Sequence, residues 1–234
     1  MRDLIIMELS RLGLDPERFV AWKVMLNGGT IFEALVATVL TQNTSDINAG
    51  RAFEALKRRI KISPSEVLSL GEEELAEVIR PAGMYMRRAR QLIELARAIL
   101  ERYGNDLEFI RNMSVEESRQ LLMSLPGIGP KTADVILVNL GKPAFPVDTH
   151  ILRISKRIGL ASTYDSASKA WMRIFQPNEY LWGHLSLIEF GRRICRARNP
   201  KCNQCGLKSI CKYSLLCLQI IILNLFPIKH SSFS

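Results

Sequence analysis

The sequence contains few stretches in which apolar and polar residues alternate with period two, the pattern of a half-buried β-strand. It also lacks a repeat of fixed period and a low-complexity linker, so no domain boundary is clearly marked. Hydrophobic residues make up 47% and charged residues 24% of the 234 residues, which are ordinary values for a globular protein. Disorder, collagen and coiled coil are therefore excluded as descriptions of the whole chain.

Signals for secretion or membrane insertion are scarce as well. Met1–Arg11 carries Asp3 and Glu8 within its apolar run, which is not the pattern of a signal peptide. The C-terminal tail, 214–234, is very apolar, but polar residues and a proline interrupt it, and its apolar part is shorter than the ~20 residues that span a bilayer. We expect an intracellular protein, cytoplasmic or associated with the nucleoid, without a membrane partner, and we assign the tail no role.

Helical patterns dominate the remaining sequence. Two capping boxes, Ser63–Glu66 and Ser114–Glu117, indicate helix starts, because each pairs a serine with a glutamate three residues later. Apolar residues repeat on one face over 87–102 and over 151–160, as they do in amphipathic helices. Phe32–Leu40 is apolar nearly all round, which indicates a buried helix. These patterns predict an all-α fold.

Positive charge and cysteine are concentrated in one segment. The net charge is +9, and residues 190–213 contribute +7 because they contain no Asp or Glu, which leaves +2 for the rest of the chain. Such a segment favours a polyanionic partner. The same segment holds four of the five cysteines, so charge and sulfur chemistry coincide.

The four cysteines have the spacing C-x6-C-x2-C-x5-C: Cys195, Cys202, Cys205 and Cys211. Disulfides are disfavoured, because we expect a reducing compartment. Zinc is an alternative, although structural zinc sites usually use two close pairs of ligands, and only Cys202 and Cys205 form a close pair here. A single wrapped loop favours a larger iron–sulfur cluster. The spacing therefore favours an iron–sulfur cluster but does not exclude zinc.

Leu125–Ala133 reads Leu-Pro-Gly-Ile-Gly-Pro-Lys-Thr-Ala and connects two helical patterns. Gly127 and Gly129 permit positive φ and a close approach of the backbone, and Pro130 suits the first turn of the second helix. Such a turn presents backbone N–H groups at a helix N-terminus, where they bind phosphate without reading base sequence. The alternative is a plain connection between two helices. The full string Leu125–Ala133 is more specific than such a connection requires.

Lys131 and Asp148 are the candidates for chemistry. Lys131 stands at the mouth of the glycine turn. Three alternative roles fit this position: a solvated charge, a phosphate contact or a nucleophile. A nucleophile requires the neutral amine, which burial and the positive end of a helix both favour. Asp148 precedes the helix over 151–160, where its ordinary role is an N-cap, and its carboxylate can also stabilise a nearby cation or position a proton transfer.

Leu125–Ala133, Val147–His150 and the four-cysteine loop together resemble the endonuclease III family of DNA glycosylases, within the helix–hairpin–helix superfamily, in content, order and separation. The resemblance covers most of the chain and implies two helical domains that flank a DNA-binding cleft. The implied domains are a six-helix domain with the hairpin over 28–141, and an iron–sulfur domain formed by two segments, 1–27 and 142–213.

The resemblance also implies an activity. Lys131 matches the lysine that attacks C1′ of the sugar, and Asp148 matches the catalytic aspartate. The implied enzyme removes oxidised pyrimidines from double-stranded DNA through a Schiff base, cuts the strand by β-elimination, also acts on abasic sites, and works as a monomer. A [4Fe–4S] cluster is implied on the four cysteines, with a structural and DNA-positioning role.

DNA contacts follow from the same resemblance. Gln42 or Asn43 is expected to fill the gap left by the flipped base, although the family has its Gln where Asn43 aligns, so this sequence departs by one position. The alternative for Asn43 is helix-end capping. Backbone contacts are expected from two hairpin glycines and three basic residues: Gly127, Gly129, Arg196, Arg198 and Lys201.

Two other functions compete with this one. A thymine or uracil mismatch glycosylase of the same superfamily is an alternative, because the Gln42–Ser45 loop is atypical. A DNA-binding module without enzymatic activity, whose cysteines hold zinc, is the second. Borohydride trapping through Lys131 distinguishes the first from a lysine-dependent lyase, and iron with sulfide in an anaerobic preparation excludes the second.

Overall fold

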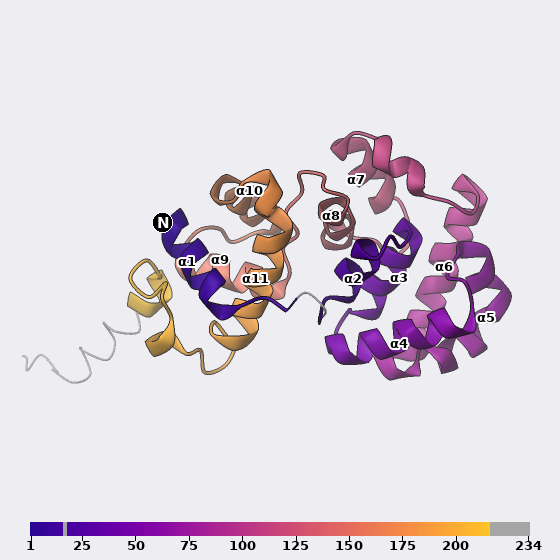
Figure 1. Cartoon of the computed structure of the whole chain (residues 1–234), viewed down its shortest axis with the longest axis horizontal. Coiled ribbons are helices and arrows are strands. Elements are labelled where there is room, and N and C mark those ends of the chain that lie inside the picture. Colours follow the sequence, from indigo (N-terminus) through magenta and orange to yellow (C-terminus); the bar gives the residue numbers. More distant parts are fainter. Residues whose placement is uncertain (16–17, 216–234) are drawn as a thin grey trace, which may run out of the picture. The chain divides into compact units, whose positions relative to one another are not determined.

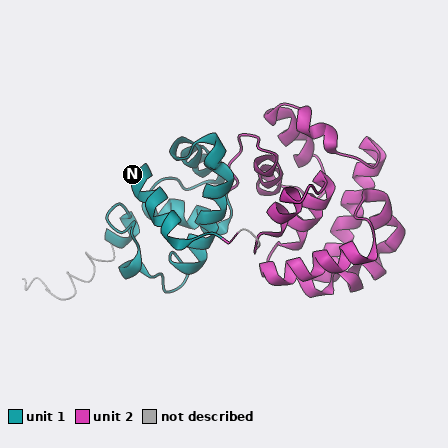
Figure 2. Cartoon of the chain, in the orientation of Figure 1, with its two compact units in different colours: residues 1–14, 147–234 teal, residues 15–146 magenta. Residues whose placement is uncertain are grey.

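The computed structural model describes residues 1–15 and 18–215, and every regular element in these ranges is a helix (Figure 1). The predicted all-α fold is confirmed. The chain divides into two compact units, Met1–Leu14 with Val147–Ser234, and Asp15–Pro146 (Figure 2). No helix within the described ranges is both long and apolar enough to cross a membrane. Of the predicted apolar tail, 216–234 lies outside the described residues.

The larger unit is a continuous stretch of chain around one buried helix. Its helices are α2 (Val20–Leu26), α3 (Ile31–Leu40), α4 (Asp46–Arg59), α5 (Pro64–Val78), α6 (Tyr85–Tyr103), α7 (Val115–Met123) and α8 (Pro130–Asn139). Every residue of α3 except Glu33 is buried, as its uniformly apolar sequence predicts. Glu33 instead closes a capping box with Thr30. Helices α2, α4 and α8 pack on α3, and α5 packs along α6.

The smaller unit is built from both ends of the chain. Its helices are α1 (Arg2–Leu12), α9 (Thr149–Ile158), α10 (Tyr164–Ile174) and α11 (Tyr180–Arg193), followed by the cysteine loop. Helix α11 packs against both α1 and α9. The core includes the fully buried Trp171, whose indole N–H donates to Ser155 Oγ over 2.8 Å. This bond satisfies two polar groups inside an apolar region.

The predicted helix starts are largely correct. The capping box of Ser114 and Glu117 is present in both directions. At the other predicted box, Ser63 Oγ accepts from the backbone N–H of Glu66 over 3.4 Å. The cap of α5 lacks the reciprocal bond from the Ser63 backbone N–H to the Glu66 side chain. Within α5, Gly71 has φ 77° and ψ 167°, which kinks the helix. The apolar periodicity of this segment does not reveal that kink.

The unit borders differ from the predicted domain borders. The predicted range 28–141 holds α3 to α8, which are six α-helices, but the larger unit runs from 15 to 146. Residues 15–27 belong to it because Val20 and Val24 of α2 are buried in its core. At the other border, Ala144 is buried in the same core. Packing, rather than a change in composition, sets these borders.

Candidate functional site

The predicted hairpin consists of α7, a glycine turn and α8. Gly127 has φ 72°, a conformation that favours glycine, and a Cβ atom there would lie 2.6 Å from Nε2 of Gln91, which would have to move. Gly129 does not use the positive φ that glycine permits: it is extended, with φ −94° and ψ 179°, and serves as the N-cap of α8. Pro130 is the first residue of α8, as predicted.

Side chains from α6 and α8 brace this hairpin. Arg119 of α7 pairs with Asp134 of α8 over 2.7 Å, and only 4% of the Asp134 side chain is exposed. From α6, Gln91 Nε2 donates to Gly127 O over 3.3 Å, and Arg102 Nη1 donates to Ser124 O over 3.3 Å. The turn is therefore fixed on both sides before any ligand arrives.

Lys131 lies in the first turn of α8, beside the positive end of the helix dipole. Its side chain is half-buried, whereas the next residues of the helix, Thr132 and Ala133, are buried. Gly129 has no side chain, so α8 begins without a side-chain cap, and no side-chain oxygen of the N-cap residue accepts from its first backbone N–H groups. An amine and an anion site thus share one helix end.

Asp148 belongs to the smaller unit, where it is the N-cap of α9. Its Oδ1 accepts from the backbone N–H of Ile151 over 2.8 Å, which confirms the predicted cap. His150 follows, and its Nδ1 lies 2.9 Å from Nη2 of Arg153. A guanidinium only donates, so Nδ1 accepts and the imidazole carries its proton on Nε2.

Burial is the main cause that lowers the pKa of His150. The carboxylate of Asp148 opposes this effect, and the guanidinium groups of Arg153 and Arg192 add to it. His150 is therefore neutral at pH 7, and Asp148 has a cation, Arg153, as its electrostatic neighbour. The contact of His150 with Arg153 is therefore a structural hydrogen bond within α9.

The loop after α3 carries the other predicted contact residues. Gln42 is half-buried and Asn43 is exposed, and Asn43 has φ 51°, a left-handed conformation. Asparagine tolerates this conformation better than most residues. Arg88 of α6 donates to the carbonyl oxygens of Val39 and Gln42, so a buried cation supports this loop from below.

The four predicted cysteines line a single pocket, together with apolar side chains that include Ile158, Phe190 and Leu207. None of these four cysteines is in a disulfide: Cys195, Cys202, Cys205 and Cys211. Within the described ranges, no three His, Cys, Asp or Glu side chains are arranged to hold a single metal ion. Burial is the largest cause that raises the pKa of the Cys205 thiol to about 11. A thiolate there requires a compensating positive charge, which a metal centre supplies.

Two arginines of α9 hold the start of the cysteine loop. Arg153 Nε donates to Cys195 O over 3.0 Å. Arg157 donates to the carbonyl oxygens of Cys195, Arg196 and Ala197, and also to Cys195 Sγ over 3.4 Å. Its guanidinium carbon lies 4.7 Å from the ring centroid of Tyr213. These guanidinium groups place positive charge beside the sulfur pocket.

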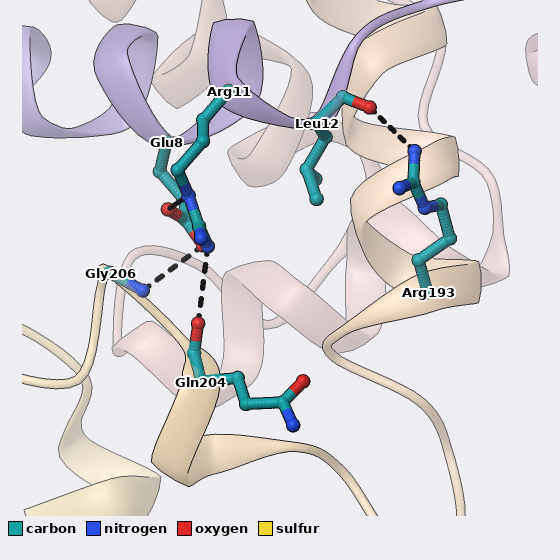
Figure 3. A network of polar contacts seen from close by, with 6 residues as sticks. All are labelled: Glu8, Arg11, Leu12, Arg193, Gln204 and Gly206. Carbon is teal, nitrogen blue, oxygen red and sulfur yellow. Dashed lines mark hydrogen bonds and ion pairs between the residues drawn. The ribbon is translucent and has the colours of Figure 1, made fainter.

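Helix α1 holds the middle of the same loop (Figure 3). The carboxylate of Glu8 is 3% exposed and accepts from Gly206 N over 3.0 Å and from Arg11 over 2.9 and 3.0 Å. Arg11 also donates to Gln204 O over 3.1 Å. A Cβ atom on Gly206 would lie 2.5 Å from Glu8 Oε2. The loop therefore rests on α1 through bonds on either side of Cys205.

The basic segment divides into structural and exposed members. Arg192 pairs with the buried Glu189 over 3.1 Å, and Arg193 donates to Leu12 O over 2.6 Å, so both stabilise the unit. The three predicted contact residues are exposed. Among them, Arg196 donates to Asn199 O over 2.8 Å, which orders the loop that carries Arg198 and Lys201.

Sequence reasoning missed Arg88, Arg157 and Glu8 as residues that shape the site. Arg88 had a weak signal, because it lies one turn before Leu92 on the apolar face of α6. A charged residue at such a position indicates a specific buried partner. Glu8 interrupts an apolar run in the same way. The partners themselves had no signal, since they lie far away in the sequence.

Comparisons with known proteins agree with these features. Residues 36–177 match the HhH-GPD superfamily of base excision DNA repair proteins. The chain is 37% identical to the endonuclease III of Thermotoga maritima over 187 residues. The matched region covers 78% of this chain and 83% of the relative. A solved endonuclease III in a non-covalent complex with DNA matches with a TM-score of 0.75 and 28% identity, over 94% of this chain and 99% of the other. A thermostable thymine-DNA glycosylase has the same fold, with a TM-score of 0.69 and 23% identity, over 92% and 98% of the two chains.

Proposed function

The chain belongs to the endonuclease III family of the HhH-GPD superfamily of base excision DNA repair proteins, and we propose that Lys131 and Asp148 carry its chemistry. It is a base excision repair DNA glycosylase with AP lyase activity. The proposed substrates are oxidised pyrimidines and abasic sites in double-stranded DNA, on which the protein acts as a monomer inside the cell. The observation that carries the proposal is the half-buried lysine in the first turn of the hairpin helix α8.

In the proposed reaction, the neutral amine of Lys131 attacks C1′ of the deoxyribose. The bond from C1′ to the base nitrogen breaks, and the base leaves with the electron pair of that bond and takes up a proton. The C1′–O4′ bond of the sugar ring then breaks, O4′ takes up a proton from solvent, and the nitrogen lone pair forms the C1′=N bond of the Schiff base. This Schiff base acidifies the hydrogen on C2′, and loss of that hydrogen as a proton expels the 3′ phosphate by β-elimination. The positive end of α8 favours the neutral amine before attack.

Asp148 provides the negative charge in this scheme. Its carboxylate stabilises the positive charge that develops on the sugar as the base leaves. One oxygen is engaged by the N-cap bond to Ile151, which fixes the orientation of the carboxylate. The same side chain therefore has a structural task and a catalytic task.

The DNA is held by its backbone and opened at one base. Amide groups of the turn at Gly127 and Gly129, together with Arg196, Arg198 and Lys201, bind phosphates without base preference. A damaged base leaves the stack at a cost of a few kcal/mol, and a polar side chain, Gln42 or Asn43, occupies the gap. The exposure and left-handed conformation of Asn43 favour that residue.

We propose a [4Fe–4S] cluster on Cys195, Cys202, Cys205 and Cys211. The shared pocket, the apolar walls and the positive charges of Arg153 and Arg157 fit such a group. When bound, the cluster supplies a rigid, covalent support for the loop and no hydrolytic chemistry. The chain's own residues then present Arg198 and Lys201 on an ordered surface.

A thymine or uracil mismatch glycosylase is the second candidate. The observation that favours it is the loop Gln42–Ser45, in which asparagine stands where the family has glutamine. The loop is close to the base in the proposed scheme, so a change there affects which base is accepted. This alternative changes the substrate and keeps the same hairpin and DNA-binding residues.

The test is a set of duplexes that contain thymine glycol, uracil, a G:T mismatch, 8-oxoguanine or an abasic site. Base release and strand cutting are measured separately, and borohydride is added to trap a Schiff base. We expect trapping on thymine glycol and abasic DNA, and no trapping with Lys131→Gln. Unchanged trapping in that variant refutes the role of Lys131. Base release from G:T alone, without trapping, supports the second candidate.

A further inference from the structure

Arg88 is a charged residue whose side chain is buried. It lies on the apolar face of α6 and is only 2% exposed. Burial, and to a smaller extent the neighbouring charge of Arg87, lowers the pKa of its guanidinium. A buried cation is costly unless hydrogen bonds compensate for the lost water. Its partners therefore explain why an arginine stands at this position.

The partners are three backbone carbonyl groups: one in the last turn of α3, one just beyond α3 and one in the turn before α6. Arg88 Nη1 donates to Val39 O over 2.7 Å, and Nη2 donates to Gln42 O, both at the C-terminal end of α3. Nε donates to Gly83 O over 2.8 Å, in the turn before α6. The last carbonyl groups of a helix lack partners within the helix, and a cation is favoured there. One guanidinium thus joins the loop after α3 to the turn before α6.

Two of these carbonyl groups directly precede strained residues. Asn43 has φ 51° and Met84 has φ 46°, and only one other non-glycine residue in the described ranges, Asn199, has a positive φ. Gln42 O belongs to the peptide unit that enters Asn43, and Gly83 O belongs to the one that enters Met84. A bond to such an oxygen fixes the orientation of the peptide plane, and with it the φ value of the next residue. Strain of this kind persists where the surroundings hold it.

Both strained residues present their side chains to solvent. Asn43 is exposed, and Met84 is 49% exposed although methionine is apolar. An amide and a flexible apolar side chain are suited to two tasks at a disrupted base step. The amide forms hydrogen bonds in the gap left by a base, and the apolar side chain enters between stacked bases. Fixed conformations lower the entropy that each side chain loses on contact.

We propose that Arg88 is a positioning residue that fixes the Gln42–Asn43 and Gly83–Met84 peptide planes, and so presents Asn43 and Met84 together as a paired probe of the DNA stack. This inference rests on the proposed glycosylase function. Arg88 itself does not contact DNA in this proposal. It acts by holding the two loops at a fixed separation, which three donors in a planar fork achieve and a single ammonium group does not.

The test compares two reactions of the intact, iron-loaded protein. Release of thymine glycol requires the base to leave the stack, whereas cutting at a preformed abasic site does not. In Arg88→Met, we expect kcat/KM for base release to fall about tenfold to a hundredfold, as for other misplaced contact groups, with cutting at the abasic site changed by less than about threefold. Arg88→Lys should recover part of the loss. Equal loss of both reactions overturns the proposal.

The control variant is Lys142→Met, which removes a half-buried cation in the same unit that, like the buried Arg88, donates to a backbone carbonyl, here Met113 O. It should lower the melting temperature without changing the ratio of the two reactions. If Arg88→Met does not fold, Met84→Ala provides the same comparison, and an unchanged ratio in it refutes the proposal. Where both fold, the double variant Arg88→Met/Met84→Ala should lose little more than Arg88→Met, and additive losses contradict an action through Met84.

A binding measurement separates this inference from the proposed function. The fluorescence of 2-aminopurine beside the lesion rises when the base step opens, whether or not a base is released. We expect wild type to raise it and Arg88→Met to raise it much less at saturating protein. Wild type that is inactive on every duplex but still opens the step refutes the glycosylase assignment alone. An equal rise in wild type and variant refutes the role of Arg88.

Discussion

At the scale of single residues, Asp148 combines two tasks that substitution can separate. Asparagine caps a helix about as well as aspartate does, but it carries no charge. We expect Asp148→Asn to change the free energy of unfolding by only a few tenths of a kcal/mol, because the bond to Ile151 N survives. Base release should fall about 10²–10⁴-fold, as for other lost acid, base or electrostatic groups. Thermal unfolding and single-turnover base release measure the two effects.

Asp148→Ala should lose both tasks, with an additional loss of about 0.5–2 kcal/mol of stability. The matched control is Thr163→Ala, which removes the N-cap of α10 in the same unit. That variant should lower stability by a similar amount and leave base release unchanged. Full activity in Asp148→Asn would show that the residue is only a cap.

The residues of the site differ in how far the sequence predicts them. Lys131 and Asp148 stand in short strings whose order and separation are specific, so the sequence alone makes them candidates. Arg88 and Glu8 carry only the weak signal of a charge within an apolar pattern, which does not reveal the partner. Glu8 reaches Gly206, 198 residues away, and such a pair has no local pattern. The structure was needed to find both.

At the scale of elements, α1 supports the cysteine loop, and loss of this support should be visible in the proposed iron–sulfur cluster. Glu8→Ala leaves Gly206 N without its acceptor, at a cost of about 1–3 kcal/mol. We expect the iron-loaded variant to lose its brown absorbance to a chelator several-fold faster than wild type. Absorbance at fixed chelator concentration and total iron measure this rate, independently of activity.

The control for this prediction is Arg59→Ala, which removes an exposed ion pair with Glu74 in the other unit. Exposed pairs contribute little to stability, so iron should leave this variant at the rate of wild type. Equal rates in Glu8→Ala and wild type would show that α1 does not support the loop. The sequence predicted most helices from caps and apolar periodicity, but it gave α1 no task, because the contact with the loop is not local.

At the scale of the whole molecule, the sequence placed the hairpin and the cysteine loop in different domains, but it did not place the borders. Residues 15–27 were assigned to the smaller domain, and the structure packs Val20 and Val24 into the core of the larger unit. No proline-rich or polar segment marks that border, so composition carries no signal. The packing of α2 on α3 depends on side-chain fit, which periodicity does not describe.

Charge distribution is the property of the whole chain that leads to the last prediction. Of the net charge of +9, the segment 190–213 supplies +7, but Arg192 and Arg193 are engaged within the unit. Arg198 and Lys201 are exposed, so they are available to phosphates. Each phosphate contact releases counterions, and we expect Arg198→Ala or Lys201→Ala to reduce the slope of log K against log salt by about 1. Binding of undamaged duplexes, measured over a range of salt concentrations, gives the slope, and Arg59→Ala should leave it unchanged. A changed lesion preference at constant slope would instead show that these residues contact the base, because backbone contacts weaken all sequences alike.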